Sequence, residues 1–278
     1  MLKTKVINDF KVRPVSVPKT ESALPGIFNS SYQNLFICAK KKSGKSQLIF
    51  NLVKRMLKIN PELAILVFSS TFHKDPVYRK MAEMSYILNP KPEKKGKGEP
   101  RSGIKFDNDE ESDREAEEPP KKKRYGKYFI KGFTSLDDDD GLNDWLELVS
   151  SADQYPQHEK QEYLLIFDDL SDQLKDIRLL ALYKKNRHYK CNTFTSSQYP
   201  MDIRPESRLQ MDIFILFPGH NKDKIKMIYK DMDVHLDFEE FWDLYEKVTK
   251  EKYNFLFYDK NTSELRKNLN ERIILPPH

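Results

Sequence analysis

The stretch that decides the fold runs from Asn34 to Ile59 and has the sequence NLFICAKKKSGKSQLIFNLVKRMLKI. It begins with a short apolar run, Leu35 to Cys38, that predicts a buried strand. A polar turn follows, and apolar residues then recur at helical spacings, at Leu48, Ile49, Leu52, Val53, Met56 and Leu57. Backbone N–H groups of such a turn and the positive end of the following helix dipole both favour an anion. Strand, SGKS and helix in this order therefore predict a phosphate-binding loop.

The residues predicted to bind the nucleotide are those of the turn and of the start of the helix: Ala39, Lys40, Lys41, Lys42, Ser43, Gly44, Lys45, Ser46 and Gln47. Lys45 is expected to reach the β- and γ-phosphates, and Ser46 to place its hydroxyl on Mg²⁺. Ala39 departs from the usual pattern G-x-x-x-x-G-K-[ST], because it stands where the first glycine is expected. Alanine there would cost free energy if the position needed a positive φ. The alternative interpretation is a lysine-rich turn capped by Ser43, with no role in phosphate binding.

The composition limits the class of protein. The chain has 278 residues, of which 38% are hydrophobic and 33% charged, and its formal net charge is +5. This length suits one large domain or two small ones, and the mild positive charge permits an anionic partner without requiring one. The two cysteines, Cys38 and Cys191, both lie in predicted strands, and the sequence shows no signal peptide or long apolar span. We therefore expect an intracellular, reducing location without a disulfide framework and without a membrane span.

The second decisive stretch is YLLIFDD, from Tyr163 to Asp169. It predicts a buried strand with two carboxylates at its carboxyl end, which is the form of a Walker B strand in a phosphate-loop ATPase. Asp168 is expected to hold Mg²⁺, and Asp169 to polarise the attacking water, where many relatives use glutamate. The next predicted strand, Cys191–Thr195, is followed by Gln198, whose amide suits a hydrogen bond to the γ-phosphate or to the lytic water.

Apolar runs and helical patterns alternate along the rest of the chain. Further strands are predicted at Leu63–Phe68, Tyr128–Ile130, Asp212–Phe217, Tyr253–Tyr258 and Arg272–Leu275. Further helices are predicted at Lys74–Leu88, Leu142–Ser151, Leu174–Tyr189, Lys222–Asp231 and Phe238–Thr249. This alternation predicts an α/β fold with a mostly parallel sheet flanked by helices. The order of the phosphate loop, the acidic strand and the strand before Gln198 is that of a P-loop NTPase (ASCE, RecA-like). In that layout the strand before Gln198 lies between the phosphate-loop strand and the acidic strand.

Two segments lie outside this pattern. Residues 1–32 are predicted to form an N-terminal arm with one short strand at Lys11–Val17, and residues 33–278 to form the ATPase domain. Within that domain, residues 89–127 are charged and almost devoid of apolar side chains, which predicts a flexible, disordered insert. The insert contains Lys121, Lys122, Lys123 and Arg124, a pattern similar to a nuclear import signal. The alternative is a solvated basic patch that balances the neighbouring acidic run.

Together these pieces resemble the viral DNA-packaging ATPases of the FtsK–HerA superfamily, the kind found in poxviruses, other large eukaryotic DNA viruses, virophages and polinton-like elements. The resemblance covers about Asn34–Gly219 and is carried by five pieces: SGKS, LLIFDD, Asn186-Arg187-His188, the strand ending in Gln198, and Ile203-Arg204 before DIFILF. Ala39 and the charged insert depart from the family pattern.

The resemblance implies an ATP-hydrolysing, Mg²⁺-dependent motor that acts as a homo-oligomeric ring, a hexamer or a pentamer, and drives double-stranded DNA into a preformed capsid. Arg187 and Arg204 are the implied candidates for an arginine that acts on the γ-phosphate of a neighbouring subunit, and the sequence does not rank them. DNA would be contacted through its backbone without base readout. Capsid or vertex proteins would be partners, and the expected location is the host cell of a virus or virus-like element, including its nucleus and the assembling virion.

Two other classes of function remain open on the sequence alone. A kinase or helicase could use the same nucleotide-binding fold, although no arginine-rich lid of the kind that a kinase needs is evident. A nucleotide-gated scaffold or DNA-binding protein that does not hydrolyse ATP is the second class. Its support is Ala39 and the aspartate, in place of glutamate, at Asp169.

Overall fold

A computed structural model describes residues 22–85, 127–151 and 161–275 of the chain. The strands are β1 Asn34–Cys38, β2 Ala64–Ser69, β3 Ile130–Phe133, β4 Tyr163–Asp168, β5 Cys191–Ser197, β6 Ile213–Leu216, β7 Leu256–Asp259, β8 Glu264–Lys267 and β9 Glu271–Arg272. The helices are α1 Lys45–Ile59, α2 Pro76–Ala82, α3 Leu142–Ser150, α4 Ile177–Lys185, α5 Pro205–Arg208, α6 Lys222–Met232 and α7 Phe238–Thr249. Two short 3-10 helices are η3 Ser171–Lys175 and η4 Pro200–Asp202.

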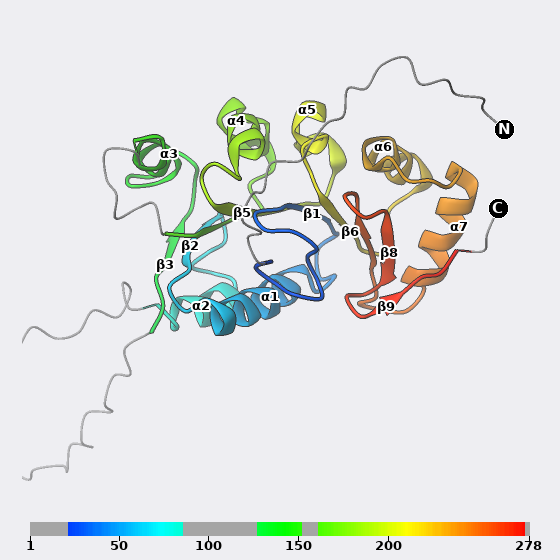
Figure 1. Ribbon diagram of the computed structural model, residues 1–278, viewed down its shortest axis with the longest axis horizontal. Helices are drawn as coiled ribbons and strands as arrows, with labels where there is room; N and C mark the ends of the chain where they lie inside the picture. The colour runs from blue at the N-terminus through cyan, green and yellow to red at the C-terminus, as the bar shows by residue number, and fades with distance from the viewer. Residues whose placement is uncertain (1–21, 86–126, 152–160, 276–278) are drawn as a thin grey trace, which may run out of the picture.

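The strands form one sheet in the order β3-β2-β4-β5-β1-β6-β7-β8-β9. The six strands from β3 to β6 in this order pair in parallel, and β6, β7, β8 and β9 pair antiparallel. Helices α1 and α2 cover one face of the sheet and α3 to α6 the other, while α7 lies beside the antiparallel strands (Figure 1). This is the predicted α/β architecture, a mostly parallel sheet flanked by helices.

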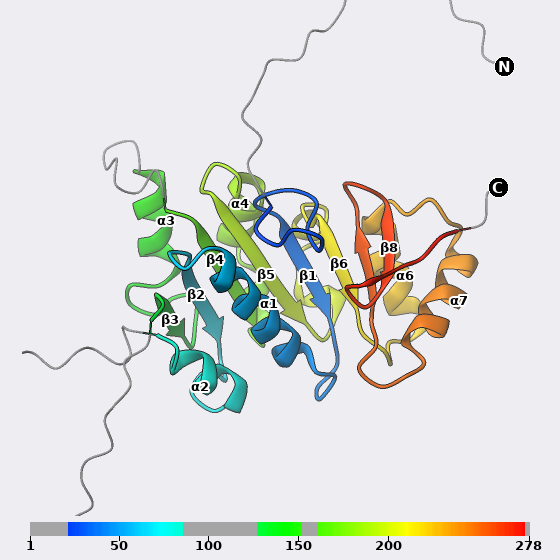
Figure 2. The same cartoon turned by 60° about the horizontal axis from the view of Figure 1, so that its bottom comes forward.

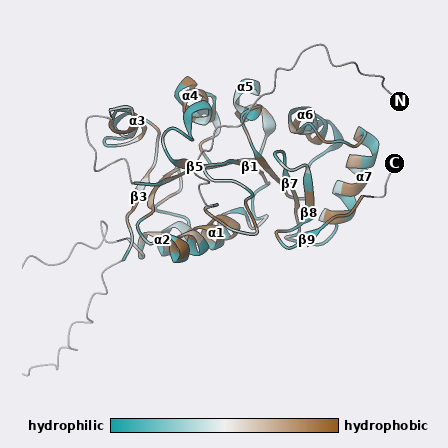
Figure 3. Ribbon diagram, viewed as in Figure 1, coloured by the Kyte–Doolittle hydropathy of each residue, from teal (hydrophilic) through white to brown (hydrophobic). Residues whose placement is uncertain are grey.

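Both faces of the parallel sheet are covered, which explains why its strands are continuous apolar runs. Every residue of β1, β2 and β4 is buried. The core forms two buried clusters, one on each face of the sheet. One includes Phe68 and Phe167 of the strands with Tyr183 of α4, and the other includes Ile37 of β1 with Val53 of α1. The helices carry both hydrophobic and hydrophilic residues, as expected for elements with one face against a sheet (Figure 3). Figure 2 shows α1 crossing in front of the central strands.

The strand order places β5 between β1 and β4, as predicted. Cys38 of β1 lies beside Ser197 of β5, and Ser196 lies beside Asp168 of β4. The carboxyl ends of these three strands therefore share one edge of the sheet. In open α/β sheets this edge is where ligands bind.

The structure differs from the sequence prediction at several elements. The helix predicted at Leu174–Tyr189 is divided into η3 and α4, because Asp176 is extended and its side chain caps α4 by accepting a hydrogen bond from the Arg178 N–H. The strand predicted from Tyr253 begins only at Leu256. The sequence analysis missed β8, and it predicted the last strand, β9, one residue too late and too long.

Part of the predicted N-terminal arm packs on the core. Leu24, Ile27 and Phe28 are buried, and the ring of Phe28 meets that of Phe194 edge to face at 6.0 Å. The strand predicted at Lys11–Val17 and the basic residues 121–124 lie outside the described residues. Cys38 and Cys191 are free and buried. Within the described ranges, no helix combines the length and the apolar character that crossing a membrane requires.

Candidate active site

The predicted phosphate-binding loop joins β1 to α1 at the carboxyl edge of the sheet. Two of its residues have positive φ, Lys42 at 62° and Gly44 at 97°, and Gly44 precedes the first residue of α1. Ala39 is buried, is not among the residues with positive φ, and donates its N–H to the Ser197 carbonyl at 3.0 Å. The steric cost considered for alanine at this position therefore does not arise. Ser43 does not cap α1, and its hydroxyl oxygen is buried without a hydrogen-bond partner in the described structure.

The first residue of α1 forms a buried ion pair with the end of β4. Lys45 Nζ lies 2.5 Å from Asp168 Oδ1 and donates a second hydrogen bond to Ser196 Oγ at 3.2 Å. The Lys45 side chain is 12% exposed and that of Asp168 only 2%. The Ser196 hydroxyl also donates to Asp168 Oδ1. A buried carboxylate of this kind requires a charged partner, and Lys45 is that partner here.

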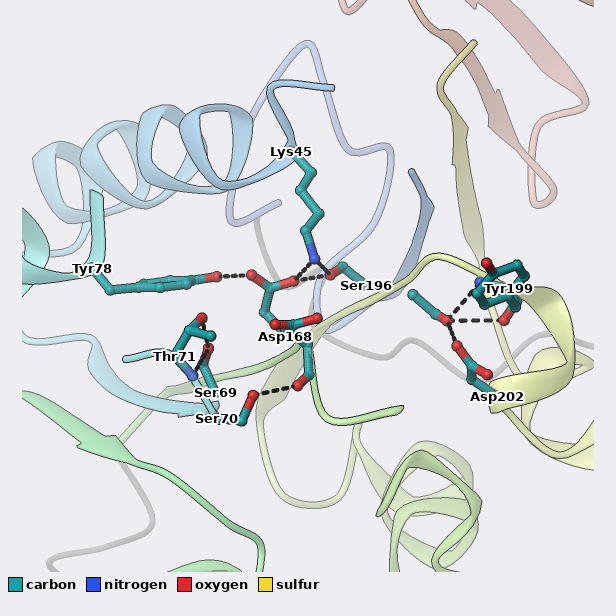
Figure 4. Close-up of polar contacts among 11 residues, drawn as sticks. Lys45, Ser69, Ser70, Thr71, Tyr78, Asp168, Ser196, Tyr199 and Asp202 are labelled. Carbon is teal, nitrogen blue, oxygen red and sulfur yellow. Dashed lines mark hydrogen bonds and ion pairs between the residues drawn. The ribbon is translucent and has the colours of Figure 1, made fainter. Parts of the chain in front are cut away.

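The other oxygen of Asp168 is held from the opposite side. Tyr78 of α2 donates its hydroxyl to Asp168 Oδ2 at 2.7 Å (Figure 4). Burial, and secondarily the negative charge of Asp168, raises the pKa of Tyr78 well above its usual value, so the hydroxyl stays protonated and remains a donor. Asp168 therefore accepts hydrogen bonds from Lys45, Ser196 and Tyr78, which fix both oxygens at the edge of the sheet.

This ion pair opens onto a cleft of about 560 Å³. The cleft is lined by Lys41, Lys42, Gly44, Lys45, Ser46, Gln47, Thr71, Lys74, Asp75, Pro76, Val77, Asp168, Asp169 and Gln198. Loop, acidic strand and glutamine strand thus contribute to one site, as the strand order requires. Asp169 has a φ of 55°, and its carbonyl accepts a hydrogen bond from Ser70 Oγ at 2.7 Å, so the chain turns sharply between the two aspartates.

The two candidate arginines lie outside this cleft. Arg187 stands between α4 and β5, at the amino end of the sheet, where its Nη2 is 3.7 Å from Asp212 Oδ1. Arg204 follows η4 on the carboxyl side, and its Nε donates to the Lys175 carbonyl. Both side chains are exposed. The structure therefore brings Lys45, Ser46, Asp168, Asp169 and Gln198 together, and separates both arginines from them.

The sequence analysis missed two residues of the site, Ser196 and Tyr78. The predicted strand order could have indicated Ser196, because this residue lies directly beside Asp168 when β5 pairs with β4. Tyr78 lies in a helix that was predicted, but no sequence pattern indicates that its hydroxyl reaches the end of β4. Tyr78 is fully buried, so its contact with Asp168 depends on how α2 packs.

The resemblance implies Mg²⁺, and the donor set fits it. A Mg²⁺ ion that binds with a nucleotide uses one or two protein oxygens together with phosphate oxygens and water. Asp168 already holds a cation, the Lys45 ammonium, and Ser46 lines the same cleft. In the described parts of the chain, no group of three or more His, Cys, Asp and Glu side chains could hold a metal by itself.

Comparison with known proteins gives a match only at the level of structure. No protein-family model matches the chain, and no curated protein sequence is detectably similar to it. The chain is similar to the genome packaging NTPase B204 from Sulfolobus turreted icosahedral virus 2 in complex with ATP-gammaS, with a TM-score of 0.51 and 16% identity over 88% of this chain and 98% of that chain. For the sulfate complex of B204 the TM-score is 0.50 and the identity 17%, over 89% and 99% of the two chains.

At such low identity the likeness is informative about the fold. The similarity extends over most of both chains, and the P-loop NTPase fold predicted from the two decisive stretches is confirmed. The chain has the fold of a viral genome packaging NTPase, as its resemblance to the viral DNA-packaging ATPases implied.

Proposed function

We propose that this protein hydrolyses ATP and, as a ring of identical subunits, moves double-stranded DNA into a viral capsid. The observation that carries the proposal is the Lys45–Asp168 pair, which opens onto a cleft that also contains Ser46, Asp169 and Gln198. The fold shared with a viral genome packaging NTPase supports packaging over other uses of the same site.

The first step is an exchange of partners by Lys45. When the phosphates of ATP enter the cleft, the ammonium moves from Asp168 to the β- and γ-phosphates, guided by the N–H groups at the start of α1. This movement frees Asp168 Oδ1, while Tyr78 and Ser196 still hold the carboxylate in place. Asp168 and Ser46 would then hold Mg²⁺, which neutralises the charge that develops on the transferred phosphoryl group.

The second step is the attack of water on the γ-phosphate. Asp169 lines the cleft beside Asp168 and accepts a hydrogen bond from the water, while the Gln198 amide orients the water or the γ-phosphate. Asp169 stands where many P-loop ATPases have glutamate, and its side chain is one methylene shorter. The backbone turns at Asp169, where φ is 55°, so its carboxylate is oriented independently of that of Asp168 at the end of β4.

The ring is proposed because neither candidate arginine lines the cleft of its own chain. Arg187 and Arg204 are both exposed and are therefore available to a neighbouring subunit's γ-phosphate. DNA would be held through its phosphates, independently of sequence. The proposed partners are capsid or vertex proteins, and the proposed locations are the host cell and the assembling virion.

Nuclear import through Lys121, Lys122, Lys123 and Arg124 is a further proposal. It is tested by neutralising these four residues in a reporter protein, and an unchanged distribution of the reporter would contradict it.

The activity is tested by measuring ATP turnover with double-stranded DNA at a protein concentration where the oligomer has been verified. Lys45→Ala and Asp169→Asn should each lower turnover by about 10²- to 10³-fold, the range seen when one preorganised catalytic group is removed. Lys58→Ala, on the exposed end of the same helix, serves as the control and should retain turnover. Normal turnover in both site variants would rule out the mechanism. ATP binding without turnover in the assembled ring would favour the scaffold alternative, and strand separation would favour a helicase.

A further inference from the structure

A second hollow lies beside the phosphate-binding loop, with a volume of about 520 Å³. Three aromatic residues, Phe217, Tyr253 and Phe255, and three polar residues, Ser43, Gln47 and Asn51, are among those that line it. We propose that this hollow holds the base of the nucleotide, stacked on Tyr253, while the phosphates occupy the cleft next to it. The assignment rests on the proposed function, because it concerns the other end of the same nucleotide.

The hollow and the phosphate cleft adjoin each other. Lys42, Gly44 and Gln47 line both of them, so the phosphate-binding loop and the start of α1 lie between the two. The two differ in chemistry. The cleft contains Lys45, Asp168 and Asp169, whereas the described residues that line the hollow include no acidic side chain and three aromatic ones. A molecule with an anionic end and a planar, largely apolar end matches this division.

Tyr253 lies against the loop itself. A Cβ atom built on Gly44 would be 3.2 Å from Tyr253 Cδ1, so the ring packs directly on the glycine that turns the chain into α1. Tyr253 is 55% exposed, and it lies in a turn with a φ of 71°. Positive φ is an outlier for a bulky residue. The backbone therefore adopts an unfavourable conformation that holds an aromatic ring at the rim of the hollow.

The remaining walls of the hollow suit a base. Phe217 and Phe255 are buried with their ring centroids 5.1 Å apart, and they form an apolar floor. Gln47 Nε2 donates to Asn51 Oδ1 at 3.2 Å, so two amide groups stand along one side, where amides can pair with the polar edge of a base. The Ser43 hydroxyl is buried and has no partner within the described residues.

The Tyr253 ring is also covered by a lysine, because Lys252 Nζ lies 4.8 Å from its centroid. A cation–π contact at an exposed site is weak, so a stacked base can displace the lysine. Removing an aromatic platform from a base typically weakens binding by about tenfold. The contribution of Tyr253 is thus expected to fall on the base alone and to leave the phosphate contacts unchanged.

The test compares two ligands that share phosphates and differ in the base: Mg-ATP and Mg-tripolyphosphate. Their dissociation constants are measured for the full chain by calorimetry or by competition. Tyr253→Ala should weaken the binding of ATP by about tenfold and leave that of tripolyphosphate unchanged, and Tyr253→Phe should restore the affinity for ATP. Tyr199→Ala is the matched control, because Tyr199 is also an exposed tyrosine under a lysine, with Lys224 Nζ 4.0 Å from its ring.

Two results would overturn the assignment. Either ATP binds Tyr253→Ala as tightly as it binds the wild-type chain, or ATP and tripolyphosphate lose affinity by the same factor. Lys45→Ala separates this assignment from the proposed function, because loss of the phosphate contacts should weaken both ligands. If Lys45→Ala binds both ligands normally, the phosphate cleft is wrong and the base assignment is wrong with it. If Lys45→Ala weakens the binding of both ligands but Tyr253→Ala binds ATP as tightly as the wild-type chain, the phosphate cleft is right and the base lies elsewhere.

Discussion

The Lys45–Asp168 and Arg208–Asp231 pairs are both buried, with N–O distances of 2.5 and 2.6 Å, but their remaining hydrogen bonds differ. Arg208 also donates Nη1 hydrogen bonds to the carbonyls of Pro200 and Ile203, so η4, α5 and α6 are held by one guanidinium. Within the described ranges, the Lys45 ammonium donates its hydrogen bonds to the side chains of Asp168 and Ser196, and its pair opens onto the cleft.

The comparison shows that burial and distance do not reveal what an ion pair contributes. A guanidinium presents a rigid set of donors, and in Arg208 these are fixed on backbone carbonyls that cannot move independently of the fold. An ammonium is a mobile point charge, and Lys45 can exchange a carboxylate for a phosphate without disturbing the backbone. We therefore expect the Arg208 pair to stabilise the fold and the Lys45 pair to act in ligand binding.

The largest expected effect is that of removing Arg208. Arg208→Met should lower the free energy of unfolding by about 3–5 kcal/mol, because Asp231 is left as a buried charge without its partner. Urea denaturation measures this loss. Lys222→Met is the control, since Lys222 pairs with Glu239 on the surface and should change stability by less than about 1 kcal/mol. If both variants lost the same stability, the assignment of Arg208 as a structural anchor would be wrong.

The second prediction concerns stabilisation by ligand. At a concentration about 100 times its dissociation constant, Mg-ATP should raise the free energy of unfolding of the wild-type chain by about 2.7 kcal/mol. Arg208→Met should keep this increment, because it leaves the cleft intact, whereas Lys45→Met should lose most of it. Unfolding with and without nucleotide measures both. An increment that survives in Lys45→Met would show that this lysine does not bind phosphate.

The third prediction concerns His220, a buried group that has no charged partner among the described residues and whose burial favours the neutral form. Burial, with help from the charges of Lys40 and Lys224, lowers the pKa of His220 to about 4. Its Nε2 lies 3.5 Å from Cys38 Sγ. As the pH falls below 6.5, the unfolded chain takes up a proton that the folded chain binds only near pH 4, so folding stability is lost across this window. Between pH 7 and pH 5 the loss from this group should be about 2 kcal/mol.

The variant His220→Gln isolates this contribution from that of the carboxylates. Its stability should fall less steeply than that of the wild-type chain between pH 7 and pH 5, as measured by denaturation at each pH. His235→Gln, a change at an exposed histidine, should follow the wild-type curve. Parallel curves for wild type and His220→Gln would mean that His220 is protonated in the folded chain at the same pH as in the unfolded one.

Much of the fold and part of the site could be predicted because both depend on short, regular patterns. Apolar runs gave the parallel strands, and the order of strands placed Lys45, Asp168 and Gln198 at one edge, since the carboxyl ends of parallel strands lie together. The break at Asp176 was missed because the apolar spacing continues across it, although Asp is a preferred capping residue.

Other features depend on tertiary packing and leave no periodic signal. Tyr78 belongs to a helix whose apolar pattern indicates a buried face, but not which strand end that face meets. Tyr253 was expected in a strand and instead occupies a turn on the phosphate-binding loop, which only the folded chain brings close. The difference between Arg208 and Lys45 is likewise invisible in sequence, because it lies in the carbonyls that one of them contacts.

The smallest predicted effect is the one that tests the Asp168 site most finely. Tyr78→Phe removes one of three donors to Asp168 and keeps the ring that fills the space under α2. In the proposed mechanism Lys45 leaves Asp168 when ATP binds, so Tyr78 and Ser196 would remain to orient the carboxylate. The Mg²⁺ concentration for half-maximal ATP turnover should therefore rise by about tenfold, the lower end of the range for groups that orient a metal ligand.

Tyr183→Phe provides the matched control for this prediction. Tyr183 is also buried, and its hydroxyl lies 2.9 Å from Thr195 Oγ1, but it does not contact Asp168. Its loss should lower stability by about 1 kcal/mol, as for a typical internal hydrogen bond, without changing the Mg²⁺ requirement. If the two variants shift the Mg²⁺ requirement equally, the Tyr78 hydroxyl has no specific role at Asp168, and Ser196 suffices to orient the carboxylate once Lys45 has moved to the phosphates. If only Tyr78→Phe shifts it, the carboxylate that pairs with Lys45 depends on a third donor, whereas among the described residues Asp231 accepts its side-chain hydrogen bond from Arg208 Nε.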